Sequence, residues 1–309
     1  MTVRTAVRHY LSVADLSAQE TWDLLKLAAE LKRHVKERRP HPRLAGLTLA
    51  MVFQKPSLRT RVSFEVGMTQ LGGHAIYLGP SDIRLGERET IEDVAATLGR
   101  MADLVMARVF GHDSVAGLAA HAGVPVINGL SDLEHPCQIL ADLLTVWEQR
   151  RRLEGQRLVF VGDGNNVAHS LLLGGALMGM HVTVLGPPGF EPRADVLERA
   201  RALAVKSGAR LAVSHDPGDV AGADVVYTDV WASMGQEAEA AARREVFRPY
   251  QVNDALMARA PGATLLHCLP AHYGEEIEYS TSRLPGAAIF DQAENRLHAQ
   301  KALMVLLAG

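Results

Sequence analysis

The sequence predicts an α/β protein of two doubly wound lobes, each a parallel sheet covered by helices on both faces. Short β-branched runs alternate with helical patterns, which is the rhythm of a parallel sheet. The rhythm restarts after Glu154-Gly155, and 309 residues are about twice a typical domain length. We therefore expect a first domain over residues 1–150 and a second over 151–292, with the active site in the cleft between them.

The elements of the first lobe follow from local signals. Ser17-Ala18-Gln19-Glu20 has the pattern of a capping box and predicts a helix that ends near Arg38. Gly72-Gly73 is a stop signal for a helix over residues 57–71, and a longer helix is expected over 135–152. The strands of this lobe are expected at residues 47–53, 74–78, 103–109 and 124–128.

The second lobe shows the same alternation. A last helix is expected from about Ala293 to Leu307, and we expect the C-terminal residues 293–309 to pack back on the first lobe. The strands of this lobe are expected at residues 157–162, 181–185, 210–214, 224–228 and 263–267.

The composition narrows the possible functions. Lys and Arg number 32 against 35 Asp and Glu, so no global charge favours a nucleic-acid or membrane partner, and any anion site must be local. The two cysteines, Cys137 and Cys268, lack metal-ligand spacing and fit a reducing compartment. There is neither an apolar signal region at the N-terminus nor a run of the roughly 18 apolar residues that a membrane helix needs. The sequence predicts a soluble cytoplasmic protein.

Polar clusters follow the carboxyl ends of six predicted strands. In open α/β sheets ligands bind at this edge, so the clusters are expected to face one cleft. They are SLRTR from Ser57, Arg108, HPCQ from His135, GDGNN from Gly162, DVWASMG from Asp229 and HCLP from His267.

The SLRTR stretch has the features of an anion receptor. The first turn of a helix leaves backbone N–H groups unpaired; Ser57 and Thr60 add hydroxyls and Arg59 adds a guanidinium fork. Phosphate or carboxylate would bind there. An N-cap serine followed by solvated arginines is the alternative interpretation. The stretch lacks the glycines of a P-loop, which disfavours a nucleoside triphosphate.

Taken together, the motifs resemble a known family. F-x-K-x-S-x-R-T-R, HPCQ, DGNN, DVWASMGQE, HCLPAHYGEE and FDQAENRLHAQKAL occur in the order and spacing of the ornithine carbamoyltransferases, of the aspartate/ornithine carbamoyltransferase family, across nearly the whole chain. The resemblance implies transfer of a carbamoyl group from carbamoyl phosphate to L-ornithine, without metal or organic cofactor. It also implies a homotrimer or a larger assembly of trimers.

The resemblance implies a carbamoyl phosphate site in the first lobe. Carbamoyl phosphate needs groups that neutralise a dianionic leaving group and polarise a carbonyl. Arg108 and His135 could donate to the oxygen that becomes an oxyanion. Arg296 would reach the site from the last helix; an ion pair with Glu294 or another neighbour is its alternative role. The residues implied to bind carbamoyl phosphate are Ser57, Leu58, Arg59, Thr60, Arg84, Arg108, His135, Gln138, Cys268, Leu269 and Arg296.

The second lobe is implied to hold ornithine. A zwitterionic amino acid needs an acceptor for its α-ammonium and donors for its carboxylate. The residues implied to bind it are Asn166, Asp229, Ser233 and Met234. The δ-amine has an ordinary pKa of ~10.4 and must lose a proton before it attacks. Asp229 and Cys268 would lie near that nitrogen, so the expected catalytic residues are Arg108, His135, Asp229 and Cys268.

Cys268 could also suggest a zinc site or a thiol nucleophile, and we reject both. Zinc needs three or four ligands, whereas His267 and Cys268 are adjacent and in an extended chain point to opposite faces. Direct attack of an amine on an activated carbamoyl group needs no covalent intermediate. The thiol is expected to orient the amine, and Cys137 is expected to be a small packing residue.

Two positions depart from the family pattern. Leu58 stands where the family commonly has threonine, so only its backbone can contact a phosphate. Arg84 stands where glutamine is common, in the loop PSDIRLGERE, which in a trimer would complete the site of a neighbouring subunit. Its length and charge change the contact that the family would make.

Three other functions are alternatives. GDGNNVAH has some likeness to a dinucleotide-binding loop, but its third glycine position is Val167 and no acidic residue ends the following strand. A carbamoyltransferase for putrescine, aspartate or an N-acylated ornithine is a nearer alternative, against which DVWASMG argues. A non-catalytic, ligand-sensing relative is disfavoured because the expected catalytic residues are all present. Arginine biosynthesis and arginine breakdown through the deiminase pathway both remain open.

Overall fold

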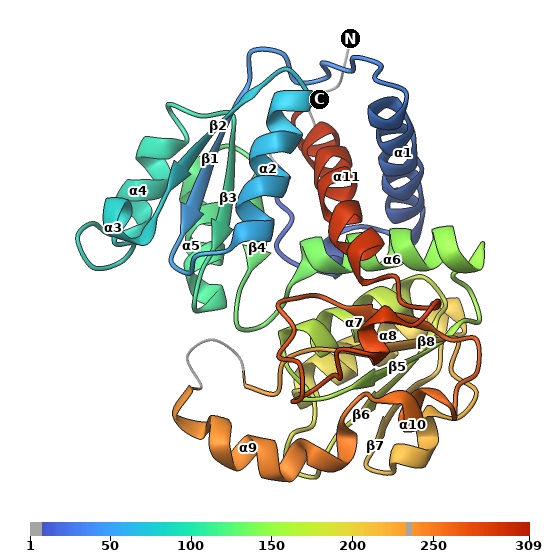
Figure 1. Ribbon diagram of the computed structural model, residues 1–309. Coiled ribbons are helices and arrows are strands. Elements are labelled where there is room, and N and C mark those ends of the chain that lie inside the picture. Colours follow the sequence, from blue (N-terminus) through green and yellow to red (C-terminus); the bar gives the residue numbers. More distant parts are fainter. Residues whose placement is uncertain (1–7, 233–236) are drawn as a thin grey trace. The chain divides into compact units, whose positions relative to one another are not determined.

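The computed structural model describes residues 8–232 and 237–309, which divide into two compact units. The first unit contains residues up to Leu144 together with Glu294–Gly309, and the second contains Thr145–Ala293. Each holds one parallel sheet, so the predicted α/β class with two doubly wound lobes is confirmed (Figure 1). No helix within the described ranges is both long and apolar enough to cross a membrane.

The first unit is built on a four-stranded sheet in the order β2-β1-β3-β4, with all neighbours parallel. Helix α2 lies on one face of this sheet, and α4 and α5 lie on the other (Figure 1). The strands are β1 (Thr48–Phe53), β2 (His74–Leu78), β3 (Leu104–Arg108) and β4 (Val126–Leu130). The helices are α1 (Ala18–Lys36), α2 (Leu58–Gln70), α3 (Pro80–Ile83), α4 (Ile91–Leu98) and α5 (His112–Ala122).

Apolar residues alternate between the two faces of this sheet and build its two core layers. Ala50, Val52 and Val105 pack in one buried cluster with residues of α4 and α5. On the other side, Gly67 brings α2 close to the last helix, because a Cβ at this position would lie 3.2 Å from the side chain of Met304. The close approach lets α11 (Ile289–Ala308) run alongside the helix that begins with the SLRTR stretch.

The second unit is built on a five-stranded parallel sheet in the order β7-β6-β5-β8-β9. Its α7 lies so close to β6 that a Cβ at Gly175 would lie 2.3 Å from Val182. The strands are β5 (Arg157–Val161), β6 (His181–Leu185), β7 (Leu211–Ser214), β8 (Val225–Thr228) and β9 (Thr264–His267). The helices are α7 (Asn166–Leu177), α8 (Ala194–Ser207), α9 (Ala240–Phe247) and α10 (Asp254–Met257), while α6 (Pro136–Arg150) contains the boundary between the units.

Two expected boundaries moved by several residues. Strand β4 begins at Val126 rather than at residue 124, where it pairs with Tyr10: the Tyr10 N–H donates to the Val126 carbonyl and the Asn128 N–H donates to the Tyr10 carbonyl. The strand extends to Leu130, which pairs with Arg108 of β3. Helix α11 begins at Ile289 rather than near Ala293. The Ala288 N–H still donates to a strand carbonyl, so the chain passes from sheet to helix without a loop.

Candidate functional site

The SLRTR stretch begins α2 as expected. Ser57 is the N-cap: its Oγ accepts the Thr60 N–H at 3.3 Å, and its hydroxyl donates to Thr60 Oγ1 at 3.1 Å. The Leu58 side chain is 75% exposed, and as the first residue of α2 Leu58 contributes its backbone N–H to the helix end. The unpaired N–H groups and partial positive charge of this turn can receive an anion.

The two arginines of the stretch have different surroundings. Arg61 points away from the helix end: its Nε lies 2.9 Å from Glu65 and its guanidinium lies 4.0 Å from the centre of the Tyr77 ring. Arg59 is partly buried, and its charge contributes to lowering the pKa of His135. The alternative of solvated arginines therefore describes Arg61, whereas Arg59 belongs to the cluster of cations around His135.

Arg296 joins this cluster from α11. Its Nη1 donates to Gln138 Oε1 at 2.9 Å and its Nη2 donates to Thr60 Oγ1 at 3.1 Å, in a buried setting. Gln138 in turn donates through Nε2 to Asp142 Oδ1 at 2.8 Å, which fixes its amide with the oxygen towards Arg296. Hydrogen bonds thus connect α6, α11 and the first turn of α2. They hold the guanidinium of Arg296 beside the end of α2.

Glu294 contacts His298 rather than Arg296, the residue with which an ion pair was considered. Its carboxylate lies 3.2 Å from His298 Nε2, one turn further along α11. Arg296 therefore has its described hydrogen bonds with neutral groups, Gln138 and Thr60. These two hydrogen bonds fix the orientation of the Arg296 guanidinium.

His135 is held neutral at the start of α6. It is buried, and burial lowers its pKa well below the ordinary value, with further lowering by the charges of Arg296, Arg108 and Arg59. Arg108 ends β3 and is itself almost fully buried. A neutral imidazole beside cationic groups can donate an N–H to a carbonyl oxygen while the guanidiniums attract an anion. The structure thus brings His135, Gln138, Arg296 and the α2 turn together.

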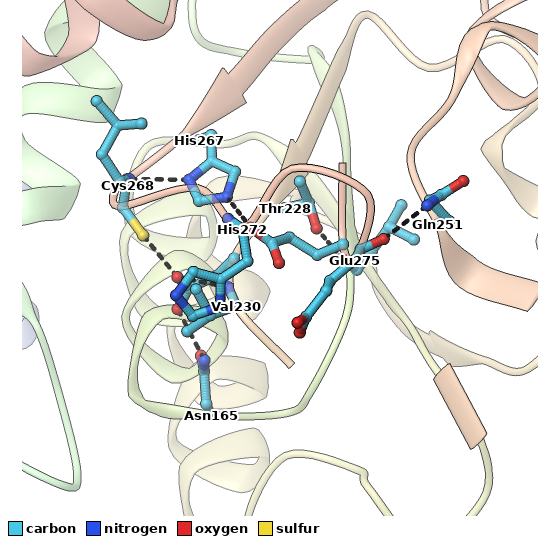
Figure 2. A network of polar contacts seen from close by, with 12 residues as sticks. Asn165, Thr228, Val230, Gln251, His267, Cys268, His272 and Glu275 are labelled. Carbon is cyan, nitrogen blue, oxygen red and sulfur yellow. Dashed lines mark hydrogen bonds and ion pairs between the residues drawn. The ribbon is translucent and has the colours of Figure 1, made fainter. Parts of the chain in front are cut away.

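Asp229 organises the polar cluster of the second unit. Its Oδ1 accepts from the Val230 N–H at 2.8 Å and from the thiol of Cys268 at 2.9 Å. Its Oδ2 accepts from the side chain of Asn165 at 2.9 Å. Figure 2 labels Asn165 and Cys268, whose dashed lines mark these two hydrogen bonds to Asp229. The buried Asp229 is therefore fixed in orientation, ready to accept from a ligand ammonium group.

Asn165 is a residue that the sequence interpretation missed. Its Oδ1 caps α7 by accepting from the N–H groups of Val167 and Ala168, and its amide nitrogen reaches Asp229. Asn166, which was expected to bind ornithine, is the first residue of the same helix. The preference of asparagine for N-cap positions could have identified Asn165 as the residue that caps α7.

The expectation that His267 and Cys268 point to opposite faces is wrong. Ligand atoms of Asp229, His267 and Cys268 all lie within 4.8 Å of one another. Strand β9 ends at His267 and Leu269 takes a left-handed conformation with φ of 59°, so the alternation of an extended chain stops there. However, both ring nitrogens of His267 are already engaged, Nδ1 with the Leu269 N–H at 2.8 Å and Nε2 with Glu276 at 3.0 Å. His267 therefore has no lone pair to offer a metal in this arrangement.

Four further residues named in the sequence analysis are Ser233, Met234, Arg84 and Cys137. Ser233 and Met234 lie outside the described residues. Arg84 is exposed and adopts a left-handed conformation with φ of 40° at the end of α3. Cys137 is buried as expected; its thiol lies 3.4 Å from the carbonyl of Asn128, and burial raises its pKa to about 12.

Comparison with known proteins agrees with this division of residues. Residues 8–148 match the family model described as aspartate/ornithine carbamoyltransferase, carbamoyl-P binding domain. Residues 154–307 match the one described as aspartate/ornithine carbamoyltransferase, Asp/Orn binding domain. The first range contains His135, Arg108 and Arg59, and the second contains the cluster around Asp229 together with Arg296.

Individual relatives cover the whole chain. An anabolic ornithine carbamoyltransferase of Pyrococcus furiosus is 52% identical over 100% of this chain and 99% of its own length. A solved structure of the ornithine carbamoyltransferase of that organism superposes with a TM-score of 0.96 over 100% of this chain and 99% of the other. A solved acetylornithine transcarbamylase, in complex with acetylcitrulline, is 34% identical with a TM-score of 0.88, over 97% of this chain and 99% of the other. The shared fold thus accommodates more than one acceptor.

Proposed function

Because the chain belongs to the aspartate/ornithine carbamoyltransferase family, we propose that it is an ornithine carbamoyltransferase. It transfers the carbamoyl group of carbamoyl phosphate to the δ-amine of L-ornithine and releases L-citrulline and phosphate. The observation that carries this proposal is the set of contacts by which Arg296 is held to Gln138 and to Thr60 at the start of α2. A buried guanidinium at a helix N-terminus suits a dianionic phosphate group.

Groups of the first unit would activate carbamoyl phosphate. Ser57, Leu58, Arg59 and Thr60 would bind the phosphate through hydroxyls, backbone N–H groups and the Arg59 fork. As the carbamoyl C–O bond breaks, negative charge grows on the departing phosphate, which the guanidiniums stabilise. His135, which is neutral because of its lowered pKa, would donate a hydrogen bond to the carbamoyl oxygen together with Arg108. These interactions strengthen as charge develops and therefore accelerate the reaction.

Groups of the second unit would hold the acceptor. Asp229 would accept from an ammonium group of ornithine, and Cys268 would orient the attacking amine. The δ-amine has an ordinary pKa of ~10.4, so it must lose a proton to attack. Asn165 supports this arrangement because its amide fixes the Asp229 carboxylate. The resemblance would add Asn166, Ser233 and Met234 as ligands of the amino acid, and would add Leu269 to the carbamoyl phosphate site.

We propose free ornithine rather than an acylated ornithine as the acceptor because the chain is more similar in sequence to an ornithine carbamoyltransferase than to the acetylornithine enzyme. The full-length relative at 52% identity is named an ornithine carbamoyltransferase, whereas the acetylornithine enzyme is 34% identical. The name of the first relative also favours the anabolic direction, towards arginine, and we propose this direction in the cytoplasm. The test is carbamoyl transfer from carbamoyl phosphate to ornithine, N-acetylornithine, putrescine and aspartate in parallel. A preference for any acceptor other than ornithine would refute the proposal.

We also propose that the chain forms homotrimers. The exposed side of α2 carries an apolar stripe of Leu58, Val62 and Val66, at a spacing of four residues, beside Ile76 on the edge strand β2. These four side chains are between 37% and 75% exposed. Contiguous apolar surface of this kind commonly marks an interface. The loop with the exposed Arg84 follows β2, so a second copy seated on this stripe could receive Arg84 at its own anion receptor.

A further inference from the structure

A fully buried pair of charged and polar side chains lies behind Cys268. His267 Nε2 and Glu276 Oε1 are 3.0 Å apart, and both side chains are completely shielded from solvent. Neither residue has a role in the reaction proposed above. Burying a carboxylate costs free energy unless the surrounding contacts repay it.

The hydrogen bonds of His267 define which nitrogen carries its proton. Nδ1 accepts from the Leu269 N–H at 2.8 Å, so the proton lies on Nε2, which donates to Glu276. The imidazole is thereby clamped between the carboxylate and the backbone of the turn that follows Cys268. A rotation of the ring would break both bonds at once.

The turn needs such support. Leu269 has φ of 59°, a left-handed conformation that is strained for a residue other than glycine. Its N–H bond to His267 stabilises this conformation. Glu276 closes the segment from the other side, because its Oε1 also accepts the His272 N–H at 2.6 Å. The position of Cys268 thus depends on the carboxylate of Glu276 through His267 and Leu269.

The strand side of the pair is fixed as well. The His267 N–H donates to Gln292 Oε1 at 2.9 Å, and Gln292 Nε2 donates to the Tyr227 hydroxyl at 3.0 Å. Tyr227 lies on β8, two residues before Asp229. Hydrogen bonds from His267 through Gln292 to Tyr227 therefore connect the chain segment that carries Cys268 with the one that carries Asp229.

We propose that His267 and Glu276 are positioning residues that hold the Cys268 thiol against Asp229 by fixing the Leu269 turn. The part of this proposal that concerns catalysis rests on the proposed function, because it takes Asp229 and Cys268 as the groups that handle the acceptor amine. The part that concerns the thiol stands on geometry alone. Without the pair, the turn relaxes and the thiol leaves the carboxylate.

The reactivity of the thiols tests the proposal independently of any enzymatic activity. A thiol beside a carboxylate is disfavoured as thiolate, so release from Asp229 should make Cys268 react faster with the aromatic disulfide DTNB. Each thiolate that attacks the reagent forms a mixed disulfide and releases one coloured aromatic thiolate. The chain has only two cysteines. Cys137, which is buried and has a pKa raised to about 12, serves as an internal control for general loosening.

Three variants separate the alternatives. Glu276→Leu removes the acceptor, and Glu276→Gln keeps an acceptor oxygen but not the charge. Glu275→Gln makes the same change one residue away, where the carboxylate pairs with Arg244 in a partly exposed position. We expect the Cys268 reaction to accelerate about tenfold in Glu276→Leu, the effect of losing one ordinary hydrogen bond, and less in Glu276→Gln. Glu275→Gln should react at the wild-type rate, and Cys137 should stay unreactive throughout.

Kinetics with ornithine complete the test. We expect Glu276→Leu and Glu276→Gln to raise KM for ornithine in the same order as the thiol rates, with Glu275→Gln unchanged. A Cys268 rate within twofold of wild type in both Glu276 variants would overturn the proposal, as would joint exposure of Cys137 and Cys268, which indicates general loosening. If only Cys268 reacts faster in the Glu276 variants and the enzyme uses an acceptor other than ornithine, the proposed function is refuted and the positioning role is supported.

Discussion

The thiol of Cys268 donates to the Asp229 carboxylate at 2.9 Å, and this contact joins the ends of two neighbouring strands of the second sheet. Asn165 fixes the other oxygen of the same carboxylate at 2.9 Å. Asp229, which follows β8, is therefore held by the side chains of two residues that follow β5 and β9. Its orientation is set before any ligand arrives, which reduces the cost of binding.

Replacement of Asp229 by asparagine should impair use of the acceptor. The substitution removes a buried countercharge for an ammonium group, so we expect kcat/KM for ornithine to fall by a factor on the order of 10² to 10³. Carbamoyl phosphate binding, measured by calorimetry, should remain within a few-fold of wild type. If that binding fails instead and ornithine kinetics persist, the assignment of substrates to the two units is wrong.

Replacement of Arg59 by alanine should impair the phosphate receptor. A charge-assisted fork to a dianion is lost, and we expect a loss of roughly 3 to 4 kcal/mol in transition-state stabilisation. Arg61→Ala is the matched control, because Arg61 pairs with Glu65 and stacks on Tyr77 instead. For both variants, kcat/KM is measured by steady-state kinetics and the affinity for carbamoyl phosphate by calorimetry. Near-normal kinetics of Arg59→Ala would remove this helix end from the active site.

His135 should make stability depend on pH below neutrality. The pKa of His135 in the folded protein lies well below 6.5. As pH falls through about 6.5, His135 is therefore protonated in the unfolded chain but stays neutral in the folded chain. Stability from this group is present above pH 6.5 and is lost at lower pH, by up to about 1.4 kcal/mol per pH unit. Urea unfolding between pH 7.5 and 5.5 should show a shallower dependence in His135→Asn. Parallel curves would show that His135 is not buried in its neutral form.

Lys301 should produce a second pH effect, in the alkaline range. Its side chain is buried on α11, its Nζ donates to Gln70 at 2.7 Å and lies 3.1 Å from His41 Nε2, and burial lowers its pKa from 10.5 to about 8. Between pH 8 and 10.5 the unfolded chain keeps a proton that the folded chain has lost. The free energy of unfolding should therefore increase as pH is raised from 8 to 10.5.

The variant Lys301→Met should lose this rise, since it has no group that titrates there. Lys206→Met is the control, because Lys206 is an exposed lysine on α8. Urea unfolding at several values between pH 8 and 10 measures both. An unchanged slope in Lys301→Met, or an equal loss of slope in Lys206→Met, would contradict burial of the ammonium group.

Mixed assemblies test whether Arg84 serves a neighbouring subunit. If Arg59→Ala and Arg84→Ala are each impaired, the two variants can be unfolded together and reassembled into mixed trimers. A shared site would then pair an intact Arg59 with an intact Arg84 at some interfaces and restore activity without a wild-type chain. Mixed trimers of confirmed composition without recovered activity would exclude a shared site, and a fully active Arg84→Ala would exclude the contact itself.

Local sequence signals were sufficient for the elements of the fold. The strands around Met51, Phe160 and Leu265 were predicted because buried parallel strands need continuous β-branched and apolar runs. Helix α1 was predicted from Ser17 and Glu20, which form the expected capping box. Sequence was less informative at strand β4, whose start pairs with Tyr10, more than 100 residues away, and whose last residue pairs with Arg108 of β3.

The sequence by itself determined which residue types the site contains, because anion receptors and ammonium acceptors require particular groups in particular motifs. Only the tertiary structure decided which of them meet. In the structure Arg61 pairs with Glu65, Asn165 donates to Asp229, and His267 lies between Glu276 and the Leu269 turn. These outcomes depend on side-chain direction and on contacts between distant segments. Hydrogen bonds of that kind follow from the packing of helices on sheets, which local sequence patterns do not specify.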